Sequence, residues 1–128
     1  MNPLTLEWAQ KAEADHAAAT WLFQAPAGFH VDAICFHAQQ CIEKYLKAWL
    51  QEAGIAFRKS HDLEEFLNLI LPVKSVWSTW RKDFIVLTAH AVDFRYPGKS
   101  AKPSDSQHAL KVCEEVRRAI RTDLGLPV

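Results

Sequence analysis

The stretch that decides the fold is residues 32–50, which read DAICFHAQQCIEKYLKAWL. Apolar residues recur there in steps of three and four, which places them on one face of an α-helix. A helix with so wide an apolar face needs partners on more than one side, so we expect the rest of the chain to pack around it. The apolar positions are Val31, Ile34, Cys35, Ala38, Ile42, Tyr45, Leu46, Trp49, Leu50 and Ala53.

Helix start and stop signals divide the first half of the chain. Asn2 followed by proline predicts the start of a first helix, and residues 24–28 stop it. Gly54 ends the central helix. Asp62 with Glu65 has capping-box spacing and predicts a short helix that ends before residue 72, with the nearby serine at position 60 as a competing cap.

The second half of the chain predicts two more long helices. One runs over residues 75–93 with Val76 facing inward, and the other begins at Ser104 with Gln107 completing a capping box. Strand-like alternation of useful length is absent from the sequence. The expected fold is therefore all-α: a single domain over residues 1–128, built as an antiparallel up-and-down bundle of four long helices plus one short helix.

Composition excludes several classes of protein. Lys plus Arg and Asp plus Glu are both 15, so zero net charge gives no global attraction to nucleic acid or membrane. The apolar runs are too short for a membrane span, and the N-terminus is not a secretory signal. Three cysteines without a signal favour free, buried thiols and a cytoplasmic protein. The four glycines are not clustered, which argues against a phosphate-binding P-loop.

One histidine and one cysteine have the spacing of a possible metal-ligand pair. His37 and Cys41 lie four residues apart and share a helix face, which suits a ligand pair. The sequence offers neither a second pair at ligand spacing nor a Cys-x-x-Cys motif. We therefore expect no metal site and no cofactor.

The polar segment at residues 94–103 is the most informative part outside the expected core. Arg95 follows a helix end, where it can bond the last carbonyls, or it can reach a phosphate while Tyr96 stacks on a base. Two lysines, Lys99 and Lys102, add positive charge nearby. Both interpretations of Arg95 remain open on spacing alone.

Two other polar patterns favour ordinary structural roles. His61 and Asp62 resemble a catalytic pair, but at a helix start they are better explained as capping residues. The last helix carries Arg117, Arg118 and Arg121, interrupted by acidic residues, so a solvated face is favoured over a nucleic-acid-binding stripe.

Several motifs together resemble HEPN domains. Residues 35–40 (CFHAQQ) followed by 43–48 (EKYLKA) resemble the signature helix of that family. Three further pieces agree in order: residues 8–15, with Trp8-x-x-Lys-Ala-x-x-Asp; residues 61–63, His-Asp-Leu; and residues 95–97, Arg-Tyr-Pro. The resemblance implies four or five α-helices, a homodimer, and a minimal nucleotidyltransferase as partner in a toxin–antitoxin or nucleotide-handling module.

The resemblance also implies a metal-independent ribonuclease in many members. Their site uses an arginine, four to six intervening residues and a histidine, with two copies facing each other across the dimer. In this sequence, no arginine is followed by a histidine after four to six intervening residues. We therefore expect a non-catalytic module that binds nucleotide through Arg95 and Tyr96, with Lys44 and His37 as further candidates.

Two other expectations follow from the same residues. One alternative is an atypical endoribonuclease that pairs Arg95 with His108, and RNA is expected as a partner only under this alternative. The chain also has five tryptophans, which a small bundle cannot easily bury together, so one or more of them is expected at an interface.

Overall fold

The structure is a computed structural model that describes residues 1–26 and 30–128. These residues form five α-helices and one 3-10 helix, without a strand, so the all-α prediction is confirmed for them. The bounds are α1 Pro3–Gln24, α2 Val31–Ala53, α3 Leu63–Ile70, the 3-10 helix Ser75–Trp80, α4 Arg81–Asp93 and α5 Pro103–Leu124.

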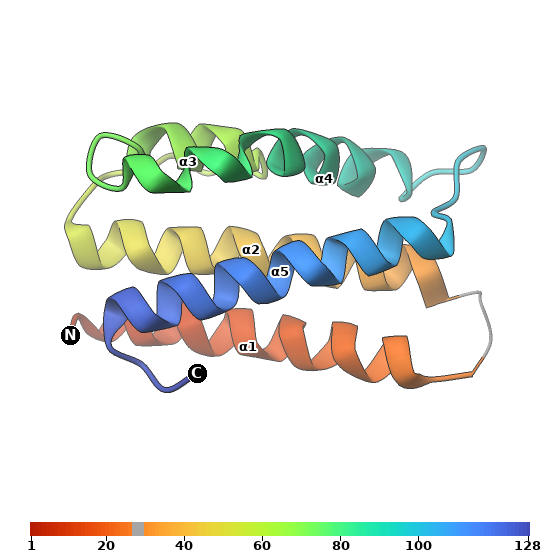
Figure 1. The fold of residues 1–128 in the computed structure, drawn as a ribbon, viewed down its shortest axis with the longest axis horizontal. Coiled ribbons are helices and arrows are strands. Elements are labelled where there is room, and N and C mark those ends of the chain that lie inside the picture. Colours follow the sequence, from red (N-terminus) through yellow and green to blue (C-terminus); the bar gives the residue numbers. More distant parts are fainter. Residues whose placement is uncertain (27–29) are drawn as a thin grey trace.

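Helix α2 is the centre of the fold. It contacts α1, α3, α4 and α5, and Figure 1 shows it in the middle row, with α1 along one side and α3 followed by α4 along the other. Its predicted apolar face is buried from Ile34 to Leu50, whereas Val31 is half-buried and Ala53 is exposed at the two ends of the helix. Three polar residues outside that predicted face, Gln39, Glu43 and Lys47, are buried as well. With neighbours on several sides, α2 has little solvated surface.

Three residues predicted to end or begin helices in the first half of the chain do so in the structure. The side chain of Asn2 accepts a hydrogen bond from the amide of Leu4 at 2.8 Å, and Gly54 takes a φ of 70° at the end of α2. Asp62 caps α3. Glu65 does not close a capping box, because it accepts two hydrogen bonds from Arg58 instead.

The end of α1 also follows the prediction where it is described. The helix ends at Gln24, and Pro26 lies just beyond it. The other two residues of the predicted stop signal, Ala27 and Gly28, lie outside the described residues.

The prediction of one long helix over residues 75–93 is wrong. A 3-10 helix occupies its first six residues, and α4 begins only at Arg81. Trp77 and Trp80 are both buried and stacked, with ring centroids 4.9 Å apart. A 3-10 helix has three residues per turn, so it aligns side chains three apart, as this stack requires. Val76, expected inward, is 68% exposed for the same reason.

The start of α5 also differs from the prediction. Pro103 is the first helical residue and Lys102 is the N-cap, so Ser104 lies inside the helix. The carboxylate of Asp105 accepts a hydrogen bond from the Lys102 amide at 2.8 Å, in place of the predicted bond from the Ser104 amide to the side chain of Gln107. Proline at the first helical position has its φ already fixed for a helix, so the helix begins one residue earlier in the chain than predicted.

The core holds all three cysteines and three of the tryptophans. Cys35, Cys41 and Cys113 are free and buried, as predicted. Of the five tryptophans, Trp21 stands out at 77% exposed, so the prediction that they cannot all be buried is confirmed. Within residues 1–26 and 30–128, no helix combines the length and the apolar character that a membrane crossing requires.

Candidate anion-binding site around Arg95

Arg95 lies in the turn that directly follows α4. Its amide donates to the carbonyl of Val92, but its exposed side chain has no hydrogen bond or ion pair with any described residue. The guanidinium carbon lies 5.0 Å from the centroid of the Phe36 ring on α2. The side chain therefore makes none of the carbonyl contacts that the helix-capping interpretation requires among the described residues. It lies against an aromatic ring instead, with its donors unpaired.

Two hollows meet at Arg95. One has a volume of about 200 Å³ and the other about 280 Å³, and both are lined by Ala91 and Arg95. The smaller is also lined by Asp32, Ala33, Phe36, His90 and Phe94. The larger is also lined by Ser60, His61, Asp62, Thr88 and Val92. A group bound to Arg95 can therefore extend into an aromatic hollow on one side and a polar hollow on the other.

The aromatic hollow suits a flat ring better than a phosphate. His90 lies over Phe94 with ring centroids 4.7 Å apart, and Phe36 forms another wall. The Nδ1 atom of His90 is buried and has no hydrogen-bond partner in the described part of the chain. Asp32 places a carboxylate here, which accepts a hydrogen bond from the Ala101 amide at 2.6 Å. That negative charge disfavours a second anion on this side.

The polar hollow contains a histidine, His61, whose ring is held by a buried carboxylate of α2. Nδ1 of His61 donates to Oε1 of Glu43 at 3.0 Å, and Glu43 is only 2% exposed. One turn earlier on α2, the Gln39 amide donates to the His61 carbonyl oxygen at 3.2 Å. Lys47 donates to the other carboxylate oxygen of Glu43 at 3.0 Å. A carboxylate on Nδ1 fixes the tautomer and leaves Nε2 available in a ring that is otherwise exposed.

Sequence reasoning did not find the contact between His61 and Glu43. It interpreted His61 as a capping residue, whereas the cap of α3 is Asp62 alone, through the Glu64 amide at 3.0 Å. The signal available in the sequence was the spacing of Gln39 and Glu43, which lie four residues apart and therefore share a helix face.

The comparison with known families decides the assignment. The model of the HEPN domain matches residues 5–122, nearly the whole chain. The chain belongs to the HEPN family. Searches of curated proteins and of solved structures returned no match. HEPN domains are helical modules of the nucleotide-binding or ribonuclease type, which agrees with an all-helical chain and an unpaired arginine beside two hollows.

Two of the predicted nucleotide contacts of this HEPN domain lie elsewhere. His37 donates to one oxygen of Asp15 at 2.9 Å, and Lys44 donates to the other at 2.5 Å. Asp15 belongs to α1 and is 8% exposed, so these two side chains join α1 to α2. Neither lines the hollows at Arg95. Tyr96 is 65% exposed and also lines neither hollow, although it follows Arg95 directly.

The histidine of the alternative site is engaged at a different place. Nε2 of His108, on α5, donates to Asp83 at 2.8 Å, near the start of α4. Arg95 follows the other end of that helix, and His108 lines neither of its hollows. The two histidines that line hollows together with Arg95 are His61 and His90. Across the described ranges, no group of three or more His, Cys, Asp or Glu side chains is arranged to hold a metal ion.

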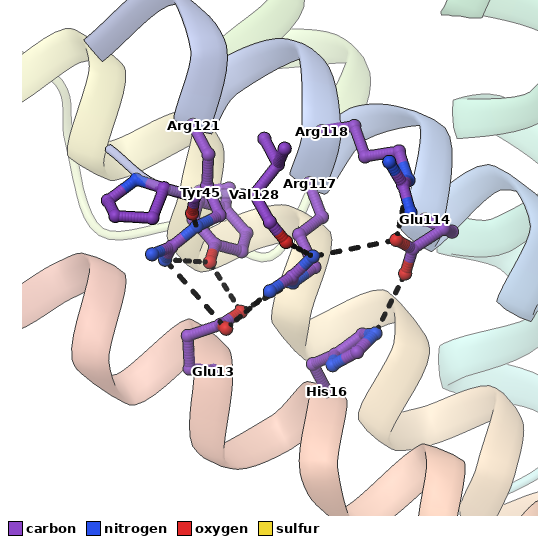
Figure 2. Close-up of polar contacts among 9 residues, drawn as sticks. Glu13, His16, Tyr45, Glu114, Arg117, Arg118, Arg121 and Val128 are labelled. Carbon is purple, nitrogen blue, oxygen red and sulfur yellow. Dashed lines mark hydrogen bonds and ion pairs between the residues drawn. The ribbon is translucent and has the colours of Figure 1, made fainter. Parts of the chain in front are cut away.

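The arginines of α5 are largely engaged within the chain, as Figure 2 shows. Arg117 donates two hydrogen bonds of 2.8 Å to Glu13 of α1, and its side chain is 12% exposed. Tyr45 donates to Glu13 at 2.5 Å and accepts from Arg121 at 2.9 Å. The prediction of a solvated face is wrong for Arg117 and Arg121, and holds for Arg118, which is 62% exposed.

These contacts change the protonation of the cluster. The pKa of Glu13 is lowered to about 2, chiefly because the Arg117 guanidinium donates to the carboxylate, with a further hydrogen bond from Tyr45. Burial, followed by the same carboxylate, raises the pKa of Tyr45. The Glu13 cluster, defined as Glu13, Tyr45, Arg117 and Arg121, therefore uses its charges for internal pairing and offers little to a ligand.

Proposed function

We propose that this HEPN domain binds the phosphate of a nucleotide at Arg95. The observation that carries the proposal is that Arg95 has an exposed guanidinium without an acidic partner among the described residues, on the face of Phe36 and between two hollows. A guanidinium presents a planar fork of donors that matches phosphate oxygens. The aromatic hollow on one side suits a nucleobase, because every base has a face that stacks.

The proposal includes the assembly that the family resemblance implies. The domain acts in the cytoplasm as a homodimer, without catalysis of its own, beside a minimal nucleotidyltransferase in a toxin–antitoxin-like or nucleotide-handling module. Tyr96 is available to stack on the base from outside the hollows, because its ring is 65% exposed. His37 and Lys44 support the site indirectly by holding α1 against α2.

Calorimetry with nucleoside mono- and triphosphates tests the binding role. We expect Arg95→Ala to weaken binding by at least about tenfold, since charge-assisted hydrogen bonds are each worth about 1.5–3 kcal/mol. Arg118→Ala is the matched control, because Arg118 is also exposed but pairs with Glu114 at 2.9 Å. Equal binding by both variants, or none by the wild type, would remove the proposal. Co-purification with a minimal nucleotidyltransferase expressed in the same cells tests the partner.

The placement of His61 supports a second candidate function, a metal-independent endoribonuclease. Arg95 and His61 line one hollow, and the buried Glu43 orients the imidazole as a carboxylate does in other acid–base sites. In this version, His61 takes the role that the sequence analysis gave to His108. Cleavage of RNA in the presence of EDTA, lost in His61→Ala and retained in His108→Ala, would support it. Nucleotide binding without cleavage would leave the binding role alone.

A further inference from the structure

Helix α4 is apolar on two opposite faces. Its inner face packs Phe84, Leu87 and Ala91 into the core. Its outer face exposes Ile85 at 49% and Val92 at 59%. The main neighbours of α4 are α2, α3 and the 3-10 helix, and α5 reaches it through the bond of His108 to Asp83. A second apolar face on a surface helix is normally covered by a partner, and the described chain supplies none for this one.

Four of the five exposed residues of α4 form one continuous seam, and the fifth, Val86 at 41% exposure, lies outside it. Lys82, Ile85, Ala89 and Val92 follow one another in steps of three, four and three residues. This is the a/d spacing of helices that pack side by side in a coiled coil. We propose that this seam, which we call the α4 seam, is the surface on which a second copy of the chain packs in the antiparallel direction. The proposal rests on the homodimer of the proposed function and names its surface.

The sizes of the seam residues fit a second copy of the same helix. In an antiparallel pair centred near residue 87, Ile85 of one copy lies opposite Ala89 of the other, and the reverse holds across the twofold axis. A large side chain therefore meets a small one at both central positions, which allows close approach of the helices. A symmetric interface needs this kind of self-complementary surface.

Charge selects the antiparallel direction. Lys82 has no hydrogen bond or ion pair with any described residue, and Asp93 is held only by a 3.5 Å contact with the exposed Lys99. The antiparallel pair places Lys82 beside Val92 and Asp93 of the second copy, at both ends of the seam. A parallel pair would place Lys82 against Lys82, where like charges repel.

The antiparallel pair also fixes where the two anion sites lie. Arg95 is eight residues beyond the centre of the seam, so the two copies of Arg95 lie at opposite ends. At 1.5 Å of rise per residue, they are about 24 Å apart along the helix axis. The dimer therefore carries two separate anion sites, each beside the 3-10 helix of the other copy.

Sedimentation velocity tests the surface with two variants, in each of which one alanine is replaced by glutamate. Ala89→Glu introduces an unpaired charge at the centre of the seam, and we expect the dimer dissociation constant to rise by about 100-fold or more. Ala17→Glu is the matched control, because Ala17 is an exposed alanine on α1 and its replacement leaves the dimer intact. Thermal melting confirms that both variants fold. A dimer that survives Ala89→Glu would overturn the surface and leave the homodimer standing, whereas a wild-type monomer would overturn both.

A charge exchange tests the direction of packing. Lys82→Glu places two acidic groups side by side at each end of an antiparallel seam, and we expect the dissociation constant to rise by about tenfold. The double variant Lys82→Glu/Asp93→Lys restores opposite charges and is expected to recover the wild-type value. Weakening by Lys82→Glu without recovery in the double variant would overturn the antiparallel direction.

Discussion

Two arginines of this domain differ in pairing and in burial, although each lies close to an aromatic side chain. Arg117 donates two hydrogen bonds to Glu13 inside the cluster of Figure 2, and only 12% of its side chain is exposed. Arg95 is exposed on the ring of Phe36 and has no acidic partner in the described part of the chain. The first arginine joins α5 to α1, while the second keeps its donors available to solvent.

The difference teaches how the fold separates stability from binding. The donors of Arg117 are paired with a carboxylate of the same chain, so removing Arg117 lowers the free energy of unfolding. The donors of Arg95 lack a protein acceptor, so they are available to a phosphate. Residue type does not separate the two cases, whereas pairing and burial do. Variants at the two sites therefore separate the two roles.

Replacing Arg117 is expected to have the largest effect on stability. Arg117→Met keeps much of the buried stem and removes both hydrogen bonds to Glu13. We expect the free energy of unfolding to fall by about 1.5–3 kcal/mol, the range for a hydrogen bond to a charged group. Urea titration followed by circular dichroism measures it. Arg118→Met is the control, with a loss below about 1 kcal/mol because its ion pair is exposed. Equal losses for both would contradict an internal role for Arg117.

The Glu13 cluster should also make stability depend on pH. The pKa of Glu13 is lowered from 4.5 to about 2 in the folded chain, so its contribution is fully present above about pH 5. The contribution is lost as the pH falls from about 5 to 2, because the unfolded chain then binds the proton first. Urea titrations across this range should show a steeper loss in the wild type than in Glu13→Gln. An unchanged slope would mean that Glu13 is not the titrating group.

A smaller effect is expected when the cluster loses only its hydroxyl group. Tyr45→Phe removes the hydrogen bond to Glu13 and the one from Arg121, and leaves the ring in the core. We expect a loss of about 1 kcal/mol, because the remaining partners of Glu13 still pair with it. Tyr45→Leu, which also disturbs the packing, should lose more. A neutral Tyr45→Phe would confine the role of the cluster to Glu13 and Arg117.

Much of the fold could be predicted from the sequence, because one period and a few caps determine it. The apolar spacing of α2 made this helix the centre of the fold, and Asn2, Gly54 and Asp62 act at the ends where they were expected. The long helix over residues 75–93 was mispredicted because a period of 3.6 does not reveal that Trp77 and Trp80 prefer to stack at three residues per turn.

The site was predictable only in part. The segment around Arg95 was found from its residue types, but the contact of His61 with Glu43 was missed because Glu43 lies outside the apolar face from which burial on α2 was predicted. Arg117 was misassigned in the same way. A helical pattern separates polar from apolar faces, yet it does not say which polar face a neighbouring helix will cover. That information depends on tertiary packing, which determines burial and therefore the strength of each charge pair.

Replacing Arg95 should change stability least and binding most, the reverse of Arg117. Arg95→Ala removes a contact with Phe36, and an exposed contact of this kind is worth about 0.5–1 kcal/mol, so the urea midpoint should shift only slightly. Nucleotide binding should weaken in the same sample, as measured by calorimetry. If Arg95→Ala instead lost as much stability as Arg117→Met, the guanidinium would be holding α4 against α2, and its outward donors would no longer mark a ligand site. A stable, non-binding variant is the outcome that keeps the two arginines distinct.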